Sequence, residues 1–356
     1  MKICDLREDR LKRFCYYVVE RNRIYKNKEI LNRPRPYSDD PIFRQYRFTN
    51  VKRWQDRESR WLIRNICLNS DLSYRDKIID CILFRSWNKS KTMEILGGPW
   101  REEDLCRLDD GAMRDRIAEF SKMNPDYAWY TGAFNTGGFK RLNRDLRFLG
   151  KTGSDSEEKC IPFRVFILYK KAERNEIFRK IESERDPVAV YSLLLSIDGF
   201  ASFLAYQVFV DLTYIPESPF SEEDLFVAGP GCKKGMSYLT DIDMESIKNK
   251  KLIEDLAVLI HDDQDVIFRG CGYSLDDEFD YLPARYRSLT YMDIENIFCE
   301  FSKISKVWEH TGRPRVRYDR PIDRFRSEND VDQEWLIDNW MTNHYLKNHA
   351  SDTIFI

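Results

Sequence analysis

The chain has 356 residues, of which 33% are charged, 42% hydrophobic and 14% aromatic, and its formal net charge is −2. This composition excludes a disordered, fibrous or collagen-like chain, and the length suffices for one large domain or two. A net charge near zero does not exclude a nucleic-acid partner, because basic residues cluster in local windows of the sequence.

Cysteine and histidine usage narrows the class of protein. The nine cysteines are odd in number and lack CxxC spacing, which indicates reduced thiols in a cytoplasmic compartment. Only two of the four histidines, His344 and His349, are close in sequence, which argues against a histidine metal site or a Ser-His-Asp triad. The start of the chain lacks an apolar signal core, and no apolar run reaches membrane-spanning length, so we expect no membrane partner.

Prolines and an acidic N-cap mark where the first helices end and begin. The sequence predicts a helix over residues 6–27, followed by an extended loop in which Pro34, Pro36 and Pro41 forbid regular helix. Asp40-Pro41 is typical of a helix start, with an acidic N-cap and proline at the first helical position.

Residues 41–65 hold seven Lys or Arg against two Asp or Glu. Four arginines recur at helical spacing and predict one basic helix face, with Trp54, Trp61 and Leu62 packing inward: Arg53, Arg57, Arg60 and Arg64. A solvated charged face and a face that contacts DNA phosphates both explain this pattern.

The next segments are expected to be mostly helical. A helix within residues 71–100 ends at Gly97-Gly98-Pro99, and Arg85 and Asn88 after its apolar run are either site residues or a solvated helix end. Further helices are expected over residues 110–122 and 161–169. The aromatic stretch 126–135, which contains Tyr130, either packs in the core or stacks on a base.

The stretch from residue 192 to 211 contains two apolar runs around Gly199-Phe200-Ala201-Ser202. It predicts two helices joined by a tight turn, in which Gly199 takes a positive φ. Such a turn is either part of a helix-hairpin-helix that faces a nucleic-acid phosphate or an ordinary buried helical hairpin.

Downstream, residues 229–235 form an expected glycine turn, Gly-Pro-Gly-Cys-Lys-Lys-Gly. It is not a Walker A motif, but its N–H groups beside Lys233 and Lys234 suit a phosphate or pyrophosphate. Amphipathic helices are expected over residues 247–261 and 291–308, then a basic segment over 313–318 and a last helix over 331–347. Six carboxylates near arginines are candidate bases or ion-pair partners: Glu20, Asp40, Asp56, Asp211, Asp224 and Glu300.

Several of these stretches, in this order, resemble one family. The first stretch combines Glu20-Arg21, Asp40-Pro41-Ile42 and residues 46–51, and the second is Arg85-Ser86-Trp87-Asn88. The third combines residues 199–207, Asp211 and residues 229–235, and the fourth is Cys299-Glu300-Phe301 with Lys303. Together they resemble the phage thymine-hypermodification family. It comprises the α-glutamyl/putrescinyl thymine pyrophosphorylases, or amino acid:DNA transferases, and the helical domain of 5-hydroxymethyluracil DNA kinases.

The resemblance implies a mostly α, DNA-glycosylase-like fold with a central helix-hairpin-helix over residues 1–320 and a peripheral helix and tail over 321–356. It implies double-stranded DNA with modified thymine as substrate, and an amino acid or polyamine that displaces pyrophosphate at the exocyclic methylene. The expected catalytic residues are Asp211, Asp56, Arg57 and Gln207, with Asp211 or Asp56 as the base. The expected DNA or substrate contacts are Arg47, Asn50, Arg53, Arg85, Asn88, Tyr130, Gly199, Ser202, Gly229, Gly231, Lys233 and Lys234.

Two other functions fit the same residues: a glycosylase-like enzyme that excises a modified base, and a non-catalytic DNA-binding module beside a separate base kinase. No bound cofactor or metal ligand set is expected. The sequence leaves open whether a divalent metal assists, and it does not identify the amine.

Overall fold

The computed structural model describes residues 1–107, 110–129, 176–197, 199–314, 316–318, 327, 332–341 and 353–356. Over these residues the protein is mostly helical, which confirms the expected class. The chain divides into two compact units: unit 1 contains Met1–Asp56, Glu222–Ile322 and Asp332–Ile356, and unit 2 contains Arg57–Ser221 and Asp323–Val331. Tyr130 and the helix expected over residues 161–169 lie outside the described residues. The domain boundary expected at residue 320 stays a prediction.

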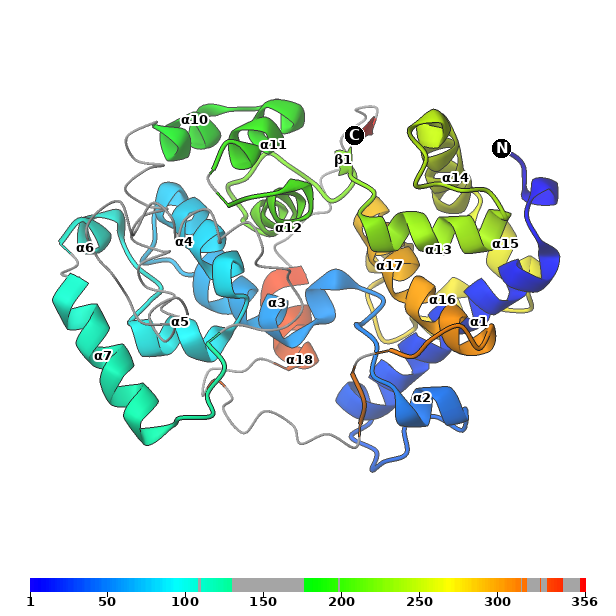
Figure 1. The fold of residues 1–356 in the computed structure, drawn as a ribbon, viewed down its shortest axis with the longest axis horizontal. Helices are drawn as coiled ribbons and strands as arrows, with labels where there is room; N and C mark the ends of the chain where they lie inside the picture. Colours follow the sequence, from blue (N-terminus) through cyan, green and yellow to red (C-terminus); the bar gives the residue numbers. More distant parts are fainter. Residues whose placement is uncertain are drawn as a thin grey trace. The chain divides into compact units, whose positions relative to one another are not determined.

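Unit 1 is built on two 18-residue helices (Figure 1). Its helices are α1 (Glu8–Tyr25), α2 (Pro41–Gln45), α13 (Pro230–Thr240), α14 (Lys250–Asp262), α15 (Gln264–Gly270), α16 (Leu275–Glu278), α17 (Tyr291–Trp308) and α18 (Gln333–Trp335), with short helical turns at Ile3–Asp5, Lys26–Ile30, Arg53–Gln55, Ile247–Asn249, Ala284–Tyr286 and Leu336–Met341. Two short parallel strands, β1 (Leu225–Phe226) and β2 (Ile354–Phe355), pair Leu225 with Ile354. The expected helix starts at Asp40 and in the 291–308 segment are confirmed: Asp40 Oδ1 accepts a hydrogen bond from the Ile42 N–H at 2.7 Å.

The core of unit 1 forms where α1 meets α17. The apolar stripe of α17 recurs at helical spacing and is fully buried: Ile294, Ile297, Phe298, Phe301 and Ile304. From α1, the Phe14 ring lies 4.9 Å from that of Phe298 and 5.3 Å from that of Phe301. Thr290 and Asp293 form a reciprocal capping box that fixes where α17 begins.

The glycine turn expected over residues 229–235 is instead the first two turns of α13, so the loop prediction was wrong. Gly229 is the N-cap and Pro230 the first helical residue. A Cβ on Gly231 would lie 2.5 Å from Cys299 Sγ, and one on Gly235 would lie 2.1 Å from the Phe298 carbonyl oxygen. These glycines allow α13 to pack closely on α17, which explains the motif without a phosphate loop.

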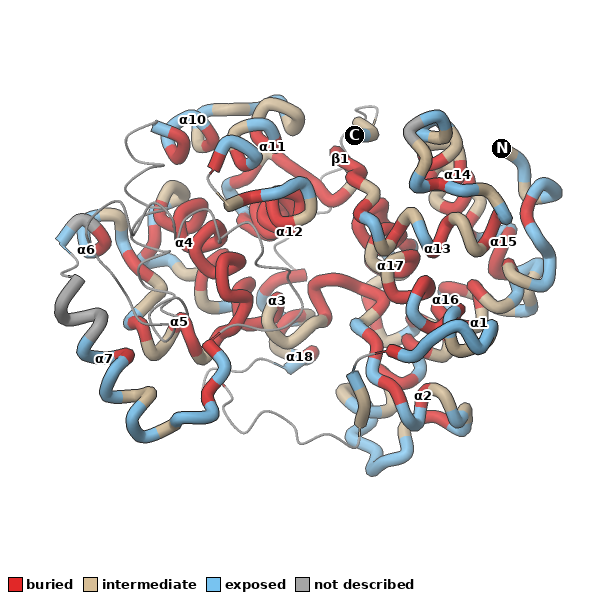
Figure 2. Tube along the Cα trace, in the orientation of Figure 1, coloured by how far each residue is buried: buried red, intermediate tan, exposed pale blue. Residues whose placement is uncertain are grey.

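Unit 2 contains the expected helical hairpin. Its helices are α3 (Arg57–Leu62), α4 (Tyr74–Trp87), α5 (Ser90–Leu96), α6 (Glu102–Arg107), α7 (Asp110–Met123), α10 (Ile177–Ser183), α11 (Pro187–Leu195) and α12 (Ser202–Thr213), with a π-helical turn at Ile63–Cys67. Gly199 has φ +91° in the turn between α11 and α12, which confirms the hairpin and its glycine. Figure 2 shows α4 and α12 buried along most of their length.

Two expected helices are broken. The segment from Arg53 to Arg64 is a 3-10 turn followed by α3 and a π-helical turn, and the division between the units falls after Asp56. The single basic face predicted there was therefore wrong: Arg53 and Arg60 are buried, whereas Arg64 is exposed. The inward packing of Trp54 and Trp61 is confirmed.

The second break falls in the helix expected within residues 71–100. It is interrupted at Asn88, whose φ of +52° ends α4 before α5 begins. Within the described residues, no helix combines the length and apolarity that a membrane span requires.

Candidate functional site

A group of buried and half-buried charged and amide side chains lies together in unit 1. We call this group the polar centre and define it as Arg21, Asn50, Asp56, Glu295 and Glu300. Arg21 comes from α1, Asn50 and Asp56 from the segment around the Arg53–Gln55 turn, and the two glutamates from α17. Three pieces of the family-like sequence, Glu20-Arg21, residues 46–51 and Cys299-Glu300-Phe301, thus contribute to one centre in unit 1.

Arg21 and Asn50 hold the backbone of this centre in place. Arg21 Nε donates to the carbonyl oxygens of Thr49 at 2.8 Å and Phe48 at 3.1 Å, and Arg21 Nη2 donates to Asn50 Oδ1. Asn50 Nδ2 donates to the Gln55 carbonyl at 3.0 Å, and the Asn50 N–H donates to Asp56 Oδ1 at 3.1 Å. Arg21 Nη1 is buried without a hydrogen-bond partner among the described residues. The N–H groups of Arg21 Nη1 are therefore left unsatisfied by the described residues in the interior of unit 1.

The carboxyl of Glu295 is suited to proton transfer. Only 2% of the residue is exposed, and Oε1 accepts a hydrogen bond from the Gly229 N–H at 3.2 Å. Burial raises the pKa of this carboxyl to about 7, and the Gly229 hydrogen bond and the charge of Arg53 limit the rise. A group with a pKa near neutrality can accept or release a proton under physiological conditions.

The other two carboxylates are paired with cations. Glu300, of which 4% is exposed, binds Lys303, and its Oε2 lies 3.4 Å from the Thr49 N–H. Asp56 Oδ2 lies 3.5 Å from Arg53 Nη1. Burial raises the pKa of Asp56, and Arg53 opposes that rise. Lys303 is exposed, so its ion pair with Glu300 joins the centre to the surface of α17.

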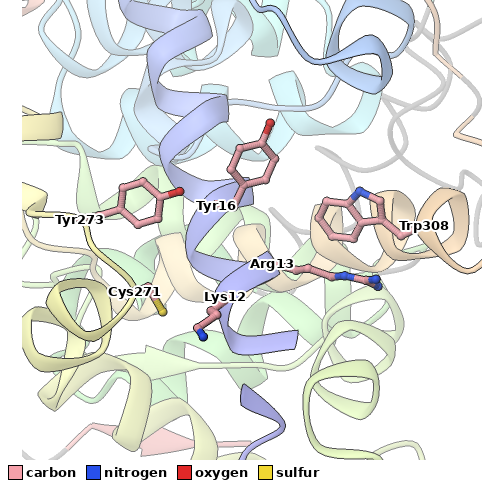
Figure 3. Close-up of a pocket in the computed structure, with 6 residues that line it drawn as sticks. All are labelled: Lys12, Arg13, Tyr16, Cys271, Tyr273 and Trp308. Carbon is pink, nitrogen blue, oxygen red and sulfur yellow. The ribbon is translucent and has the colours of Figure 1, made fainter. Parts of the chain in front are cut away.

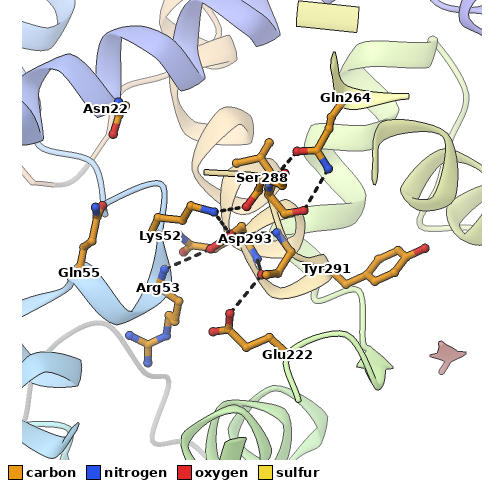
Figure 4. A network of polar contacts seen from close by, with 12 residues as sticks. Asn22, Lys52, Arg53, Gln55, Glu222, Gln264, Ser288, Tyr291 and Asp293 are labelled. Carbon is orange, nitrogen blue, oxygen red and sulfur yellow. Dashed lines mark hydrogen bonds and ion pairs between the residues drawn. The ribbon is translucent and has the colours of Figure 1, made fainter. Parts of the chain in front are cut away.

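A buried network beneath the centre fixes the Arg53 turn to the start of α17 (Figure 4). Lys52 Nζ lies 2.8 Å from Asp293 Oδ2 and also donates to the Ser288 carbonyl, while the Arg53 N–H donates to Asp293 Oδ1 at 3.4 Å. Lys52 and Asp293 are both buried. Since this ion pair has no solvent access, its role is to position the centre.

The remaining predicted site residues of unit 1 lie outside the centre. Arg47 is exposed, and its guanidinium lies 5.6 Å from the Tyr318 ring. Lys234 is exposed and lies 3.9 Å from Glu245, whereas Lys233 is half-buried. Gly229 contributes its N–H to Glu295, and Gly231 packs on Cys299. Phosphate binding by the two lysines stays a prediction.

In unit 2 the structure brings Arg85, Asn88 and Asp211 together. Arg85 Nη2 lies 2.6 Å from Asp211 Oδ1, Arg85 Nε binds the other carboxylate oxygen, and Arg85 Nη1 donates to Asn88. Arg85 Nη2 also donates to Ser59 Oγ at 3.2 Å. Neither Arg85 nor Asp211 has an exposed side chain, and Gln207 is buried as well. This geometry is that of a structural ion pair, and the catalytic role expected for Asp211 and Gln207 stays a prediction.

The hairpin turn of unit 2 is accessible. Ala201 and Ser202 are exposed, and α12 begins without a side-chain cap at Ala201.

Two other candidate residues of unit 2 make contacts within the unit. Arg57 of α3 pairs with Glu58 at 2.7 Å, and Trp129 packs on Tyr127 and Phe120. Base stacking by Trp129 is therefore disfavoured by its burial.

A separate pocket of about 390 Å³ lies over α1. Its lining residues are Lys12, Arg13, Tyr16, Cys271, Tyr273 and Trp308 (Figure 3). Arg13 is held by Glu309 at 2.8 Å and by the Tyr238 hydroxyl at 2.5 Å. Cys15 and Cys271 are both free thiols, and a hydrogen bond from the buried Cys15 thiol lowers the pKa of Cys271 to about 7. Across the described part of the chain, no three His, Cys, Asp or Glu side chains converge as a metal site.

Glu295 and the role of Arg21 were missed from the sequence. Glu295 lies on the apolar face of α17, three residues before the buried Phe298. An acidic residue on the buried face of an amphipathic helix needs a partner, and this was the signal that could have found it. Glu300 was one of six candidate carboxylates, and only the fold distinguishes it and Asp56 from the rest.

Comparisons with known proteins agree with the family that the sequence motifs resemble. Residues 8–312 match the model of the family described as 5-hmdU DNA kinase, helical domain. The chain is 24% identical over 302 residues to the 5-hmdU DNA kinase of Bacillus phage SP10; this covers 80% of the chain and 43% of that kinase. The chain therefore spans less than half the length of this relative. No solved structure matches the chain significantly.

Proposed function

The chain belongs to the family of 5-hmdU DNA kinase helical domains, and from this premise we propose that it is a transferase of DNA thymine hypermodification. Its substrate is 5-hydroxymethyluracil in DNA that carries a pyrophosphate on the exocyclic oxygen. An amine of an amino acid or polyamine attacks the exocyclic methylene carbon, so that a C–N bond forms and the C–O bond to pyrophosphate breaks.

The observation that carries this proposal is the buried carboxyl of Glu295, with its pKa of about 7. An amine must lose a proton to become a stable secondary amine, and a carboxylate of this pKa can take that proton near neutral pH. Asp56 is the second candidate base, because its pKa is also raised and it lies in the same centre.

The cations of the centre suit the leaving group. Pyrophosphate leaves readily when its charge is neutralised, so the reaction needs positioning and electrostatic stabilisation rather than covalent catalysis. We assign the binding of its oxygens to Lys303 at the exposed edge of the centre, with the buried charge of Arg21 behind it. Arg53 lies close enough to lower the pKa of Glu295 and supports the same charge balance.

The hairpin of unit 2 supports contact with the DNA backbone. Gly199 has a positive φ, and the uncapped start of α12 at Ala201 presents backbone N–H groups beside the exposed Ser202. This arrangement is typical of helix-hairpin-helix turns that bind a phosphate. We therefore propose a DNA-glycosylase-like use of this hairpin, with the target base flipped out of the duplex.

The second candidate function is a non-catalytic DNA-binding module that works beside a kinase. It is favoured by one observation: the chain matches only 43% of a relative whose name describes a kinase.

Nucleoside mass spectrometry separates these functions. Duplex DNA with pyrophosphorylated 5-hydroxymethyluracil is incubated with the protein and a mixture of amino acids and polyamines. We expect a new thymidine adduct, which also identifies the amine. Abasic sites would instead indicate a glycosylase, and unchanged nucleosides together with tight DNA binding would indicate the module.

A further inference from the structure

Two basic segments that are far apart in the sequence meet on the surface of unit 1. The Arg47 N–H donates to the Val316 carbonyl at 3.1 Å, and the Tyr318 N–H donates to the Gln45 carbonyl at 3.0 Å. Tyr46 and Arg317 form an isolated antiparallel bridge between these bonds. The pairing places Arg47 on the segment next to Arg317, and Arg35 lies near the Tyr318 ring.

We group the arginines and tyrosines of these two segments under the name arginine surface: Arg33, Arg35, Arg47, Arg313 and Arg317 with Tyr37 and Tyr318. Arg33, Arg35, Arg47 and Arg313 are exposed, and Arg317 is half-buried. Arg33, Arg35 and Arg313 make no ion pair with any carboxylate that the structure describes. Exposed guanidinium groups without a described carboxylate partner suit contact with an anionic group such as a phosphate.

Aromatic rings order these arginines. The Arg35 guanidinium lies 4.9 Å from the centre of the Tyr318 ring, and that of Arg47 lies 5.6 Å from it. Tyr37 lies 6.4 Å from the same ring. Arg35 Nη1 also donates to the Tyr318 carbonyl at 3.3 Å, and a guanidinium held near a ring in this way suits contact with phosphate oxygens through its other N–H groups.

Hydrogen bonds to Asn27 fix the conformation of the loop that carries Arg33 and Arg35 before any partner binds. The Arg33 N–H donates to the Asn27 carbonyl at 2.9 Å, Arg33 Nη1 donates to Asn27 Oδ1 at 3.0 Å, and Asn27 Nδ2 donates to the Tyr37 carbonyl at 2.9 Å. Pro34 and Pro36 further limit its conformations. A preorganised loop loses little entropy when it binds.

From these observations we propose that the arginine surface binds the phosphate backbone of the DNA substrate. This inference rests on the proposed function for the identity of the polyanion. Arg47 lies three residues before Asn50, so one short segment carries both this surface and part of the polar centre. DNA held on the surface is thereby kept next to the proposed catalytic groups.

The test is fluorescence anisotropy with a 20-base-pair duplex across a series of NaCl concentrations. The variant R33A/R35A/R313A is compared with wild type and with Arg269→Ala, which removes an exposed arginine of unit 1 away from this surface. We expect the triple variant to bind at least about tenfold more weakly near 100 mM NaCl. The slope of log Kd against log salt should also fall by about two to three, since each lost phosphate contact lowers it by about 0.9.

Thermal unfolding of the triple variant controls for misfolding. The variant with lysine at the same three positions keeps the charge and shows how much of the binding depends on charge alone. Unchanged Kd and salt slope in the triple variant would overturn the proposal, as would a failure of the wild type to bind duplex. An acidic polypeptide that displaced DNA and bound more tightly would also overturn it. If the triple variant loses DNA binding while the wild type forms no thymidine adduct, the proposed role of the arginine surface is supported and the proposed transferase function is wrong.

Discussion

Arg85 and Asp211 form a two-pronged ion pair inside unit 2, in which Nη2 of Arg85 lies 2.6 Å from Oδ1 of Asp211 and neither side chain is exposed. The pair joins α4 to α12, and Asn88 and Ser59 occupy further N–H groups of the guanidinium. Asp211 therefore belongs to a satisfied buried network, which explains a charged residue in the middle of the apolar helix α12.

Asp211→Asn should strongly destabilise the protein. The substitution leaves the Arg85 charge buried without a counter-charge, which costs about 3–5 kcal/mol of unfolding free energy. Urea unfolding measures the loss. The double variant R85M/D211L, which removes both charges, should recover most of it.

The same variant separates two roles of Asp211. If D211N unfolds at the wild-type urea concentration and yet loses all turnover, Asp211 is a catalytic base and the structural interpretation is wrong.

Gly231→Ala and Gly235→Ala should both weaken the packing of α13 on α17. A second substitution at Cys299 should restore stability to Gly231→Ala but not to Gly235→Ala. The added methyl of G231A meets the Cys299 side chain, so C299A should restore stability to G231A. The methyl of G235A meets the Phe298 backbone, which cannot be removed. We expect a loss of about 1–3 kcal/mol for each single variant, measured by thermal or urea unfolding. Equal rescue of both variants by C299A would contradict this contact geometry.

Cys271 should react with iodoacetamide with a half-maximal rate near pH 7. The hydrogen bond from Cys15 stabilises its thiolate and lowers its pKa to about 7, and the Lys12 charge acts in the same direction. Removing the hydrogen bond in C15A should shift the midpoint to higher pH. Peptide mass spectrometry measures the labelling, with the exposed Cys4 in the same sample as a reagent control. An unchanged midpoint in C15A would contradict the thiol–thiol contact.

Glu295 should make stability depend on pH. Its pKa is raised in the folded protein from 4.5 to about 7, so the folded state binds a proton that the unfolded state has released between these values. Wild-type stability relative to E295Q should therefore fall by about 3 kcal/mol as pH rises through this window and stay constant above it. Urea unfolding at pH 5 and pH 8 measures the change, and E334Q, at an exposed carboxyl of unit 1, should show none. A constant difference between wild type and E295Q would contradict the raised pKa.

Local signals predicted the helices well. Asp40-Pro41 begins α2, the amphipathic pattern of residues 291–308 gives α17, and Gly199 turns the hairpin, because each signal depends only on residues nearby in the sequence. The basic helix face failed for a physical reason: helical spacing assigns a face only if the helix is continuous, and this segment breaks at Asp56.

The polar centre required the fold. Arg21, Asn50 and Glu300 lie in stretches that could be noticed separately, but nothing in their spacing shows that α1, the Arg53 turn and α17 meet. Glu295 was overlooked because it was treated as one acid of an amphipathic helix, whereas its position beside Phe298 and Tyr291 buries it. The glycines of α13 show the converse case, since a pattern that resembles a phosphate loop serves helix packing.

The most direct test of the proposed chemistry is the single-turnover rate of thymidine-adduct formation on pyrophosphorylated 5-hydroxymethyluracil DNA. It is measured from pH 5.5 to 8.5 for wild type and E295Q. The ratio of the two rates removes the ionisation of the amine itself. We predict that this ratio rises with a midpoint near pH 7 and reaches about 10²–10⁴, the contribution typical of a general base. A ratio near one at every pH, with adduct formed by both proteins, would contradict the assignment of Glu295 and of the polar centre as the site of transfer.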